Sequence, residues 1–413
     1  MRIWDEKTYS EATYAIKLPV FPSMPDSRAI DGQSKICNWL FNNLLEKAHN
    51  LKQEYKEHGN KDAGRILYTK RGFRNELTRL KKEKPFLKSV HSSPLKNTAL
   101  RLSRSIKAYQ DSRKGRRKGK AIGWPKFKSF KREFFSLEYE EPFKGYAVHD
   151  GILELSFGLG EERKQNHIKM PMPDSKLIKD KNVKKMTLVK ESGLYFAIFT
   201  VTKKLPQEKI IKKTIALDPN HKNLAYGVDS ECNAVEIENA YWLKNYEKRF
   251  DELKSKRDRC KRKSQLIEVK NAEGEIIKSY WKASRRYERY QRVLERARAK
   301  RRDQIKTYRY SVANALYKHY DLVTIGDYTP HGGGISKKMR RAMNNQSTIG
   351  KFKKTLSWCA EKAGKKFSIW NEKGSTQTCH ACLKIVPKGL SPNIREWTCA
   401  HCKTHHYRMK TVP

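Results

Sequence analysis

The chain has 413 residues, and its 90 Lys and Arg against 44 Asp and Glu give a formal net charge of +46. Such an imbalance argues against an enzyme of small neutral metabolites and indicates a protein that binds a polyanion. Hydrophobic residues make up 37% and aromatic residues 10% of the sequence, which is enough to pack cores and excludes a wholly disordered basic tail.

Apolar runs and cysteines indicate where the protein resides. No apolar run approaches the ~18 residues of a membrane span, and the N-terminus lacks the apolar stretch of a signal peptide. Only eight cysteines occur, four of them in one short C-terminal cluster, which favours a metal site in a reducing compartment over a disulfide scaffold. We therefore expect a soluble cytoplasmic protein with no membrane partner.

The first half of the chain passes from a strand-like pattern to a helical one and back. Residues 11–20 alternate apolar and polar side chains and predict a strand. Apolar residues at near-helical spacing then predict a helical region, with interruptions, from Ile36 to Tyr109. Five short β-like runs follow between residues 134 and 204. Together with residues 11–20 they could close a barrel, whose first strand would be distant in sequence from the others.

A mixed α/β pattern begins near Lys213. A short apolar run at 214–217 ends at Asp218 and predicts a strand. Two further strands are expected at 224–228 and 234–237. The elements predicted after them, in chain order, are two long basic helices at about 241–263 and 281–320, a strand at 322–325, a Gly-rich loop, a helix near 348–363 and a strand at 366–371.

A basic stretch, residues 113–120, leads into a segment in which aromatic side chains alternate with lysines. Cations neutralise phosphates and aromatic faces stack on bases, so we interpret both stretches as a nucleic-acid-binding surface rather than a solvated loop. The long helix near Arg296 adds a second basic surface, because acidic partners for i,i+4 pairs are scarce there. The candidate contacts are Arg113, Lys114, Arg116, Arg117, Lys118, Lys120, Trp124, Lys126, Lys128, Arg285, Arg286, Arg296, Arg298, Arg301 and Arg302.

The most specific motif is a pair of Cys-x2-Cys sequences. Cys379 and Cys382 are followed, after sixteen residues, by Cys399 and Cys402. Each pair forms a knuckle that directs two thiolates at one ion, and two knuckles complete a tetrahedral Zn²⁺ shell with no open position. We therefore predict a structural zinc site. Nearby histidines could substitute as ligands, but four cysteines make that unnecessary.

Around Asp218 and the cysteines, the sequence resembles the TnpB family of transposon-encoded RNA-guided nucleases, which are related to type V CRISPR effectors. An Asp at the end of a first strand is how RNase H-like nucleases present a metal ligand, although such an Asp alone is more often only a turn or cap residue. Residues 218–225 are similar to the first RuvC motif of the family, and residues 99–130 to the segment before its β-barrel. Residues 375–379 and 395–399 closely match its zinc segment.

The resemblance implies a multidomain α/β fold. It comprises an RNase H-like RuvC domain with an inserted zinc ribbon, a β-barrel wedge domain and a helical recognition domain. The implied partners are a guide RNA derived from a transposon end and double-stranded target DNA, with sequence specificity delegated to base pairing. The implied domains are a wedge barrel at 1–26 and 121–210, a recognition domain at 27–120, a RuvC-like domain at 211–378, a zinc module at 379–402 and a truncated RuvC tail at 403–413.

The acidic residues depart from the family pattern, which supplies an Asp, a Glu and a final Asp to two metal ions. Asp218 matches the first, but Gly326 stands at the glutamate position and Met409 where the last Asp belongs. Glu372, at the end of the neighbouring strand, offers a replacement, although turns attract acidic residues without any catalytic role. Asp327 would face the opposite side of its strand. Because a thioether is a poor ligand for Mg²⁺, we interpret Asp218 and Glu372 as a vestigial or partial site with no productive Mg²⁺.

The resemblance and these departures imply an RNA-guided DNA-binding protein that has lost its nuclease activity. In a prokaryotic, nucleoid-associated setting, it would repress transcription by occupying a matched site. Two alternatives stay open. One is an active TnpB-type endonuclease with a rearranged acidic site, and the other is a dead guide complex that recruits transcription machinery such as a sigma factor.

Overall fold

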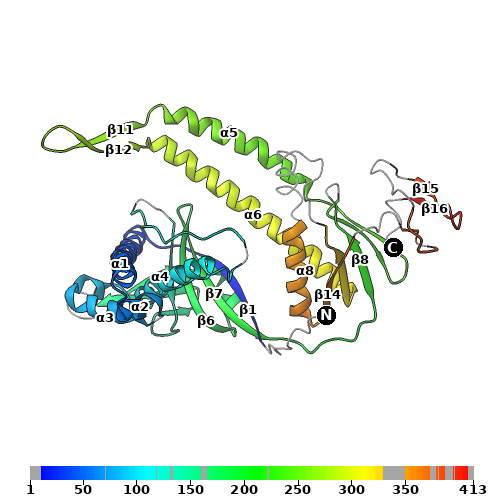
Figure 1. Cartoon of the computed structure of the whole chain (residues 1–413), viewed down its shortest axis with the longest axis horizontal. Coiled ribbons are helices and arrows are strands. Elements are labelled where there is room, and N and C mark those ends of the chain that lie inside the picture. Colours follow the sequence, from blue (N-terminus) through cyan, green and yellow to red (C-terminus); the bar gives the residue numbers. More distant parts are fainter. Residues whose placement is uncertain are drawn as a thin grey trace. The chain divides into compact units, whose positions relative to one another are not determined.

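The structure, a computed structural model, describes residues 11–69, 71–117, 119–130, 134–159, 165–220, 223–328, 349–372, 378–379, 381–386, 394 and 396–407 (Figure 1). These residues fall into two compact units, Glu11–Lys203 and the part from Lys204 onward, and each has its own hydrophobic core. Lys118, Met409 and the predicted Gly-rich loop lie outside the described residues. In the described part, no helix is long and apolar enough to cross a bilayer.

Helices dominate the first part of the N-terminal unit, as the sequence predicts. The longest, α1, follows Ser23, whose side-chain oxygen accepts a hydrogen bond from Asp26 N, and a proline in its first turn suits the helix start. α1 packs against α4, with Leu40, Leu44 and Leu102 fully buried. The bounds are α1 Met24–Glu57, α2 Lys61–Tyr68, α3 Gly72–Glu83, the 3₁₀ helix η1 Pro85–Ser89 and α4 Ser92–Arg113.

The strands of this unit form two sheets and not the closed barrel that the sequence predicted. One sheet has the order β1-β7-β6-β2 and the other β3-β4-β5, so the distant first strand does join the later ones. Between β2 and β3 the chain turns at Phe143, with φ 64°, and enters the second sheet. One backbone bond, from Phe21 N to Pro171 O (3.0 Å), links the end of β1 to the end of β5, but the ladders described there do not continue into a closed ring. The bounds are β1 Glu11–Val20, β2 Phe135–Tyr139, β3 Tyr146–His149, β4 Ile152–Leu159, β5 Gln165–Pro171, β6 Asn182–Glu191 and β7 Leu194–Lys204.

A five-stranded mixed sheet is the centre of the C-terminal unit. Its order is β10-β9-β8-β13-β14, in which β8, β13 and β14 are parallel and β9 and β10 antiparallel. Leu217 pairs with Ile325, and Gly326 pairs with Trp370, so the carboxyl ends of the three parallel strands are level. The bounds are β8 Thr214–Asp218, β9 Ala225–Asp229, β10 Ala234–Ile237, β13 Leu322–Gly326 and β14 Lys366–Trp370.

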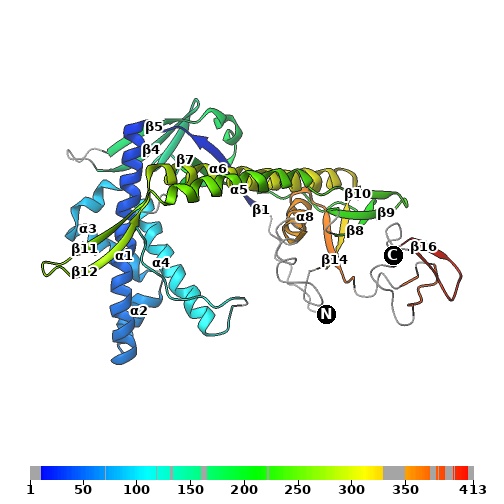
Figure 2. The same cartoon turned by 90° about the horizontal axis from the view of Figure 1, so that it is seen from above.

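Helices pack against this sheet and extend away from it. Phe352 and Leu356 of α8 (Ile349–Ala363) and Ala313 of α6 (Arg285–His319) share its buried core. α5 (Lys244–Lys261) runs beside α6, and Figures 1 and 2 show the pair ending in a β-hairpin, β11 (Gln265–Lys270) and β12 (Ile276–Lys282).

The sequence-based prediction missed this hairpin and assigned Trp281 to the second long helix. α6 in fact begins after Ser284, whose Oγ accepts a hydrogen bond from Tyr287 N. The missed signal was two short apolar runs on either side of a turn at Asn271–Gly274, where Gly274 has φ +84°. The prediction left residues 264–280 unassigned between two helices, because short apolar runs flanked by basic helical sequence are ambiguous by periodicity alone.

The carboxylate of Asp321 connects the starts of the three parallel strands. Its Oδ2 accepts hydrogen bonds from the backbone N of Lys212 (3.1 Å) and Lys213 (3.2 Å), just before β8. Its Oδ1 pairs with Lys365 Nζ at 3.1 Å, just before β14. These hydrogen bonds and the lysine charge hold the pKa of Asp321 below its ordinary value. The backbone N of Lys366 also donates to Asp321 O (2.9 Å), so one residue ties the central strand to both neighbours.

Asp321→Ala is expected to destabilise the C-terminal unit by about 1–3 kcal/mol, because it leaves the backbone N–H groups of Lys212 and Lys213 without their acceptor. Lys365 loses its carboxylate partner but keeps the carbonyls of Tyr317 and Tyr320 as acceptors. Chemical denaturation measures the loss. Asp303→Ala is the matched control, since Asp303 is 60% exposed in a surface pair with Arg302 and its removal costs about 0.5 kcal/mol or less. Equal stability losses in the two variants would contradict the role given to Asp321.

Candidate functional site

Three carboxylates come together at the edge formed by the carboxyl ends of β8, β13 and β14. Asp218 is the last residue of β8, Asp327 follows β13, and Glu372 lies two residues after β14. Asp327 N donates to Trp370 O (2.9 Å), and Asp327 Oδ1 accepts from Glu372 N (3.1 Å). The parallel register therefore brings Glu372 to the same edge as Asp218.

Glu372 fills the space beside Gly326. A Cβ at position 326 would overlap the Glu372 carboxylate, so the absence of a side chain on β13 is what admits this group. The Glu372 carboxylate, which follows β14, thus lies beside the end of β13. Any larger residue at position 326 would displace it.

The groups at this edge perturb one another's ionisation. Burial, together with the charge of Asp218, raises the pKa of Glu372 to about 7, and burial also raises the pKa of Asp218. Lys353 of α8 donates from Nζ to Tyr328 O (3.1 Å), and its charge opposes the rise at Glu372. Burial lowers the pKa of Lys353 itself. Carboxylates with raised pKa values beside a partly buried lysine are typical of functional sites, although structural networks also produce them.

Two residues of this edge were not expected there. Strand alternation predicted that Asp327 faces away, but β13 ends at Gly326, and the alternation rule does not extend beyond a strand end. Asp327 instead holds the backbone of Glu372 and adds to the rise of its pKa. Lys353 had no signal in the sequence, because a single lysine on a basic amphipathic helix is ordinary.

The four cysteines converge as their spacing predicts. Their sulfur atoms all lie within 4.8 Å of one another, with Cys379 Sγ 3.4 Å from Cys402 Sγ and Cys382 Sγ 3.7 Å from Cys399 Sγ. A tetrahedral Zn²⁺ with bonds of about 2.3 Å holds sulfurs about 3.8 Å apart, so the donor set fits this ion. With all four cysteines bound to it, a tetrahedral ion would have no position left for a reacting group.

Each knuckle is a short hydrogen-bonded turn. Cys379 N donates to Lys384 O (3.0 Å), and Cys399 N donates to Thr404 O (2.9 Å). The residues directly after the second cysteines, Leu383 and Lys403, have φ of 57° and 61°, a left-handed conformation that lets the turn close around the ligands. Hydrogen bonds at Thr404 lower the pKa of Cys402, which favours the thiolate that a metal requires, whereas burial and hydrogen bonds with the neighbouring thiols raise the pKa of Cys382.

A histidine supports the cluster without entering it. His406, 1% exposed, lies with Nε2 3.2 Å from Cys379 Sγ, and its ring stacks on Trp397 with centroids 4.2 Å apart. The two residues are directly paired across β15 (Glu396–Thr398) and β16 (His405–Tyr407). An imidazole N–H bonded to a ligand atom orients that ligand and tunes the metal. His406 is therefore better placed as a support than as a substitute ligand.

The predicted nucleic-acid contacts lie on both units. Trp124 is half-buried: Lys52 Nζ lies 4.3 Å from its ring centroid, and the ring of Tyr109 meets it edge-on at 5.2 Å. The rings that face solvent in this segment are Phe127 and Phe130, 58% and 52% exposed. Phe127 belongs to the predicted aromatic and basic motif, although neither ring was among the candidate contacts. Lys128 and Arg301 are partly buried, Lys118 lies outside the described residues, and the exposed contacts are Arg113, Lys114, Arg116, Arg117, Lys120, Lys126, Arg285, Arg286, Arg296, Arg298 and Arg302.

The C-terminal segment matches a known domain family. Residues 350–408 match the family described as Cas12f1-like, TNB domain, and this segment contains Glu372 and the four cysteines. No curated protein matches the sequence.

Solved structures show what fold the chain has. Cas12f1, determined by cryo-electron microscopy in complex with sgRNA and target DNA, is similar with a TM-score of 0.52 and 11% sequence identity, over 92% of this chain and 93% of that chain. A CRISPR-Cas12f ternary complex (11% identity, 94% and 83% covered) has a TM-score of 0.31, and CasPhi-2 bound to crRNA (9% identity, 97% and 96% covered) one of 0.37. The likeness to Cas12f1 shows a shared α/β fold, and together with the domain match it confirms the predicted resemblance to TnpB proteins and type V effectors.

Cys379→Ser is expected to abolish stoichiometric zinc binding, because three thiolates and a hydroxyl do not complete the shell. Elemental analysis of the purified chain should give one zinc per wild-type molecule and a small fraction of that in the variant. Cys232→Ser is the control, since Cys232 is an exposed cysteine outside the cluster. Full zinc content in Cys379→Ser would contradict the four-cysteine assignment.

The raised pKa of Glu372 predicts a pH-dependent stability. Between the ordinary value of 4.5 and about 7, the folded chain binds more protons at this site than the unfolded chain. Stability contributed by Glu372 therefore falls as pH rises through that window. In chelator-containing buffers, Glu372→Gln should be more stable relative to wild type at about pH 8 than at about pH 5, as measured by apparent Tm. Glu361→Gln, on the exposed face of α8, is the control; a pH-independent difference for Glu372→Gln would contradict the prediction.

Proposed function

We propose that the chain is an RNA-guided DNA-binding protein whose RuvC-like site no longer cleaves, and that it represses transcription by occupying matched DNA. The proposal is supported chiefly by the sequence, because Gly326 and Met409 stand at two positions where the resemblance implies acidic metal ligands. In the part of the chain that the structure describes, one group of three or more His, Cys, Asp or Glu side chains is close enough to hold an ion, and it is the four-cysteine cluster. The acidic edge, as far as its residues are described, does not form a second one.

Cleavage by two metal ions needs several carboxylates around cations about 3.5–4 Å apart. Asp218 and Glu372 would supply two of them, but Met409 stands where the resemblance requires the last, and its thioether does not replace an oxygen ligand. The Asp327 carboxylate accepts a hydrogen bond from Glu372 N. The charge of the Lys353 ammonium acts on the side-chain carboxylate of Glu372. The positive charge of Lys353 near this carboxylate lessens its attraction for a metal ion.

Guided binding to nucleic acid is supported by the charge and by the fold. The net charge of +46 suits a protein that grips an RNA scaffold and a heteroduplex at once. The mixed sheet, with an Asp at the end of β8 and parallel strands beside it, is the arrangement that the resemblance implies for a RuvC-like domain. Cas12f1, whose fold the chain shares, was solved with sgRNA and target DNA. The four cysteines would hold a structural Zn²⁺ that fixes the two knuckles.

A second candidate function is an active endonuclease with a rearranged acidic site. The observation that favours it is the position of Glu372, whose carboxylate fills the space of the side chain that Gly326 lacks. Asp218 and Glu372 would therefore act as ligands from the ends of β8 and β14, while Asp327 accepts a hydrogen bond from Glu372 N. This alternative needs one further oxygen ligand, and cleavage assays separate it from the first.

The protein purified with its own RNA should bind supercoiled plasmid that carries the matched site and leave it intact in Mg²⁺. Gel electrophoresis reports nicking and linearisation, and filter binding of a labelled fragment reports occupancy. A plasmid with a scrambled target is the control, and its binding should be weaker by at least about 10³-fold, the lower end of specific discrimination.

Two outcomes would decide against parts of the proposal, and one variant tests the reason for inactivity. Nicking that Asp218→Ala abolishes would establish the active endonuclease instead. Equal binding to matched and scrambled targets would reject guidance and indicate sequence-independent binding. Met409→Asp tests the reason for inactivity: a gain of Mg²⁺-dependent nicking that is lost again in the Asp218→Ala background would place the defect at the third acidic position.

A further inference from the structure

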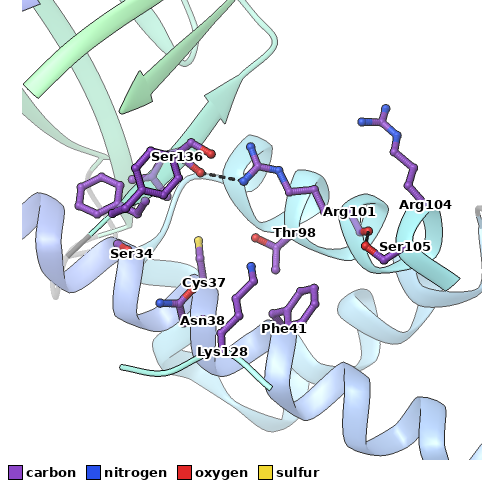
Figure 3. A pocket seen from close by; sticks show the side chains of 13 residues that line it. Ser34, Cys37, Asn38, Phe41, Thr98, Arg101, Arg104, Ser105, Lys128 and Ser136 are labelled. Atoms are coloured by element: carbon purple, nitrogen blue, oxygen red, sulfur yellow. Dashed lines mark hydrogen bonds between the residues drawn. The ribbon is translucent and has the colours of Figure 1, made fainter. Parts of the chain in front are cut away.

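The N-terminal unit contains a pocket of about 430 Å³ (Figure 3). Of the nucleic-acid contacts predicted from the sequence, Lys128 alone is among the described residues that line it. One wall is a single face of α1, with Ser34, Cys37 and Phe41 at helical spacing. The opposite wall is α4, and the start of β2 closes one end. Its volume lies in the range of about 300–1,000 Å³ that small-molecule sites occupy.

Two sets of hydrogen bonds hold this pocket in shape. The side chain of Asn42 accepts from Lys128 N (2.7 Å) and donates to Lys128 O (2.9 Å), so it clamps the basic segment to α1. Arg101 Nη1 donates to Ser136 O (3.1 Å) and joins α4 to β2. Lys128 Nζ lies 3.9 Å from the ring centroid of Phe41. These contacts fix two cations at the pocket before any ligand arrives.

The lining combines positive charge with neutral and aromatic groups. Arg101, Arg104 and Lys128 contribute three cations, and no carboxylate is among the described residues that line the pocket. Cys37 at the floor is buried, and burial raises the pKa of its thiol to about 11, so that surface is neutral. Arg104 extends outward at the rim (Figure 3), and Phe134, also a lining residue, is 45% exposed.

We propose that this pocket accepts one nucleotide of a nucleic-acid strand, with its phosphate at the cations and its base against the aromatic and neutral surface. A phosphate needs fixed cations without competing carboxylates, and a base needs a flat apolar face with hydrogen-bonding groups nearby. Thr98 and Ser105 place hydroxyls at the same pocket. A strand suits it better than a free nucleotide, because exposed Lys126, Phe127 and Phe130 belong to the same segment as Lys128 and extend the basic, aromatic surface beyond it. The inference rests on the proposed nucleic-acid binding, but not on the state of the acidic edge.

Photo-crosslinking to the full chain tests the inference. The probes are an oligouridine of about 15 nucleotides with one 4-thiouridine and a matching thymidine oligomer with one 4-thiothymidine, so the two arms distinguish RNA from DNA. Peptide mapping should place crosslinks on the peptides that contain Ser34–Phe41 or Phe134–Leu137 in at least one arm. Ser105→Trp, which fills the pocket without removing charge, should lower the crosslink yield by about tenfold and weaken binding by about fivefold, as the loss of one stacked base implies.

The controls keep the result interpretable. Lys107→Gln removes an exposed cation of α4 that does not line the pocket, and its crosslink yield should stay within about twofold of wild type. Asn38→Trp fills the pocket from α1 and replaces Ser105→Trp if that variant fails to fold by circular dichroism. Unchanged crosslinks in a folded filled variant, or crosslinks confined to Phe127 and Phe130, would overturn the pocket. Absence of any oligomer binding by the wild-type chain would instead reject the proposed nucleic-acid function.

Discussion

The arrangement of the candidate site depends on one carboxylate, that of Asp321, which directly precedes β13, the middle one of the three parallel strands. Its oxygens accept from two backbone N–H groups before β8 and pair with Lys365 before β14. A parallel sheet has no hairpin turns to fix its register, so such contacts at the strand starts, together with the buried residues, set the register. Because the starts are tied, the opposite ends are level, and that is where the acidic residues meet.

The level strand ends explain how the edge tolerates a glycine where the related proteins are expected to carry a glutamate. With no Cβ on Gly326, the carboxylate of Glu372 enters from the neighbouring strand and takes up the same space. Half-burial next to Asp218 then raises its pKa. The substitution at one strand and the acidic residue at the next are therefore a single structural arrangement, whether or not the edge still binds a metal ion.

Much of the fold followed from local pattern, and the failures concern how strands pair. The helices of the N-terminal unit, the order of the strands near Asp218 along the chain and the distant strand β1 agree with expectations from periodicity. The prediction of a closed barrel was wrong because the pairing of those strands depends on partners far along the chain. The β11–β12 hairpin was missed because its pairing depends on turn geometry. Periodicity identifies a strand without stating which strand it will join.

Parts of the candidate sites were likewise predictable from local spacing, and other parts depended on the tertiary structure. The sequence by itself determined which four cysteines come together as a possible zinc site, because Cys-x2-Cys spacing forms a knuckle with few tertiary requirements. It also determined the excess of positive charge. Only the tertiary structure decided that Glu372 fills the space beside Gly326, that Asp327 and Lys353 lie at the same edge, and that α1, α4 and Lys128 enclose a basic pocket. Each of these places together residues that are remote along the chain, and sheet register and helix packing, not local spacing, set those distances.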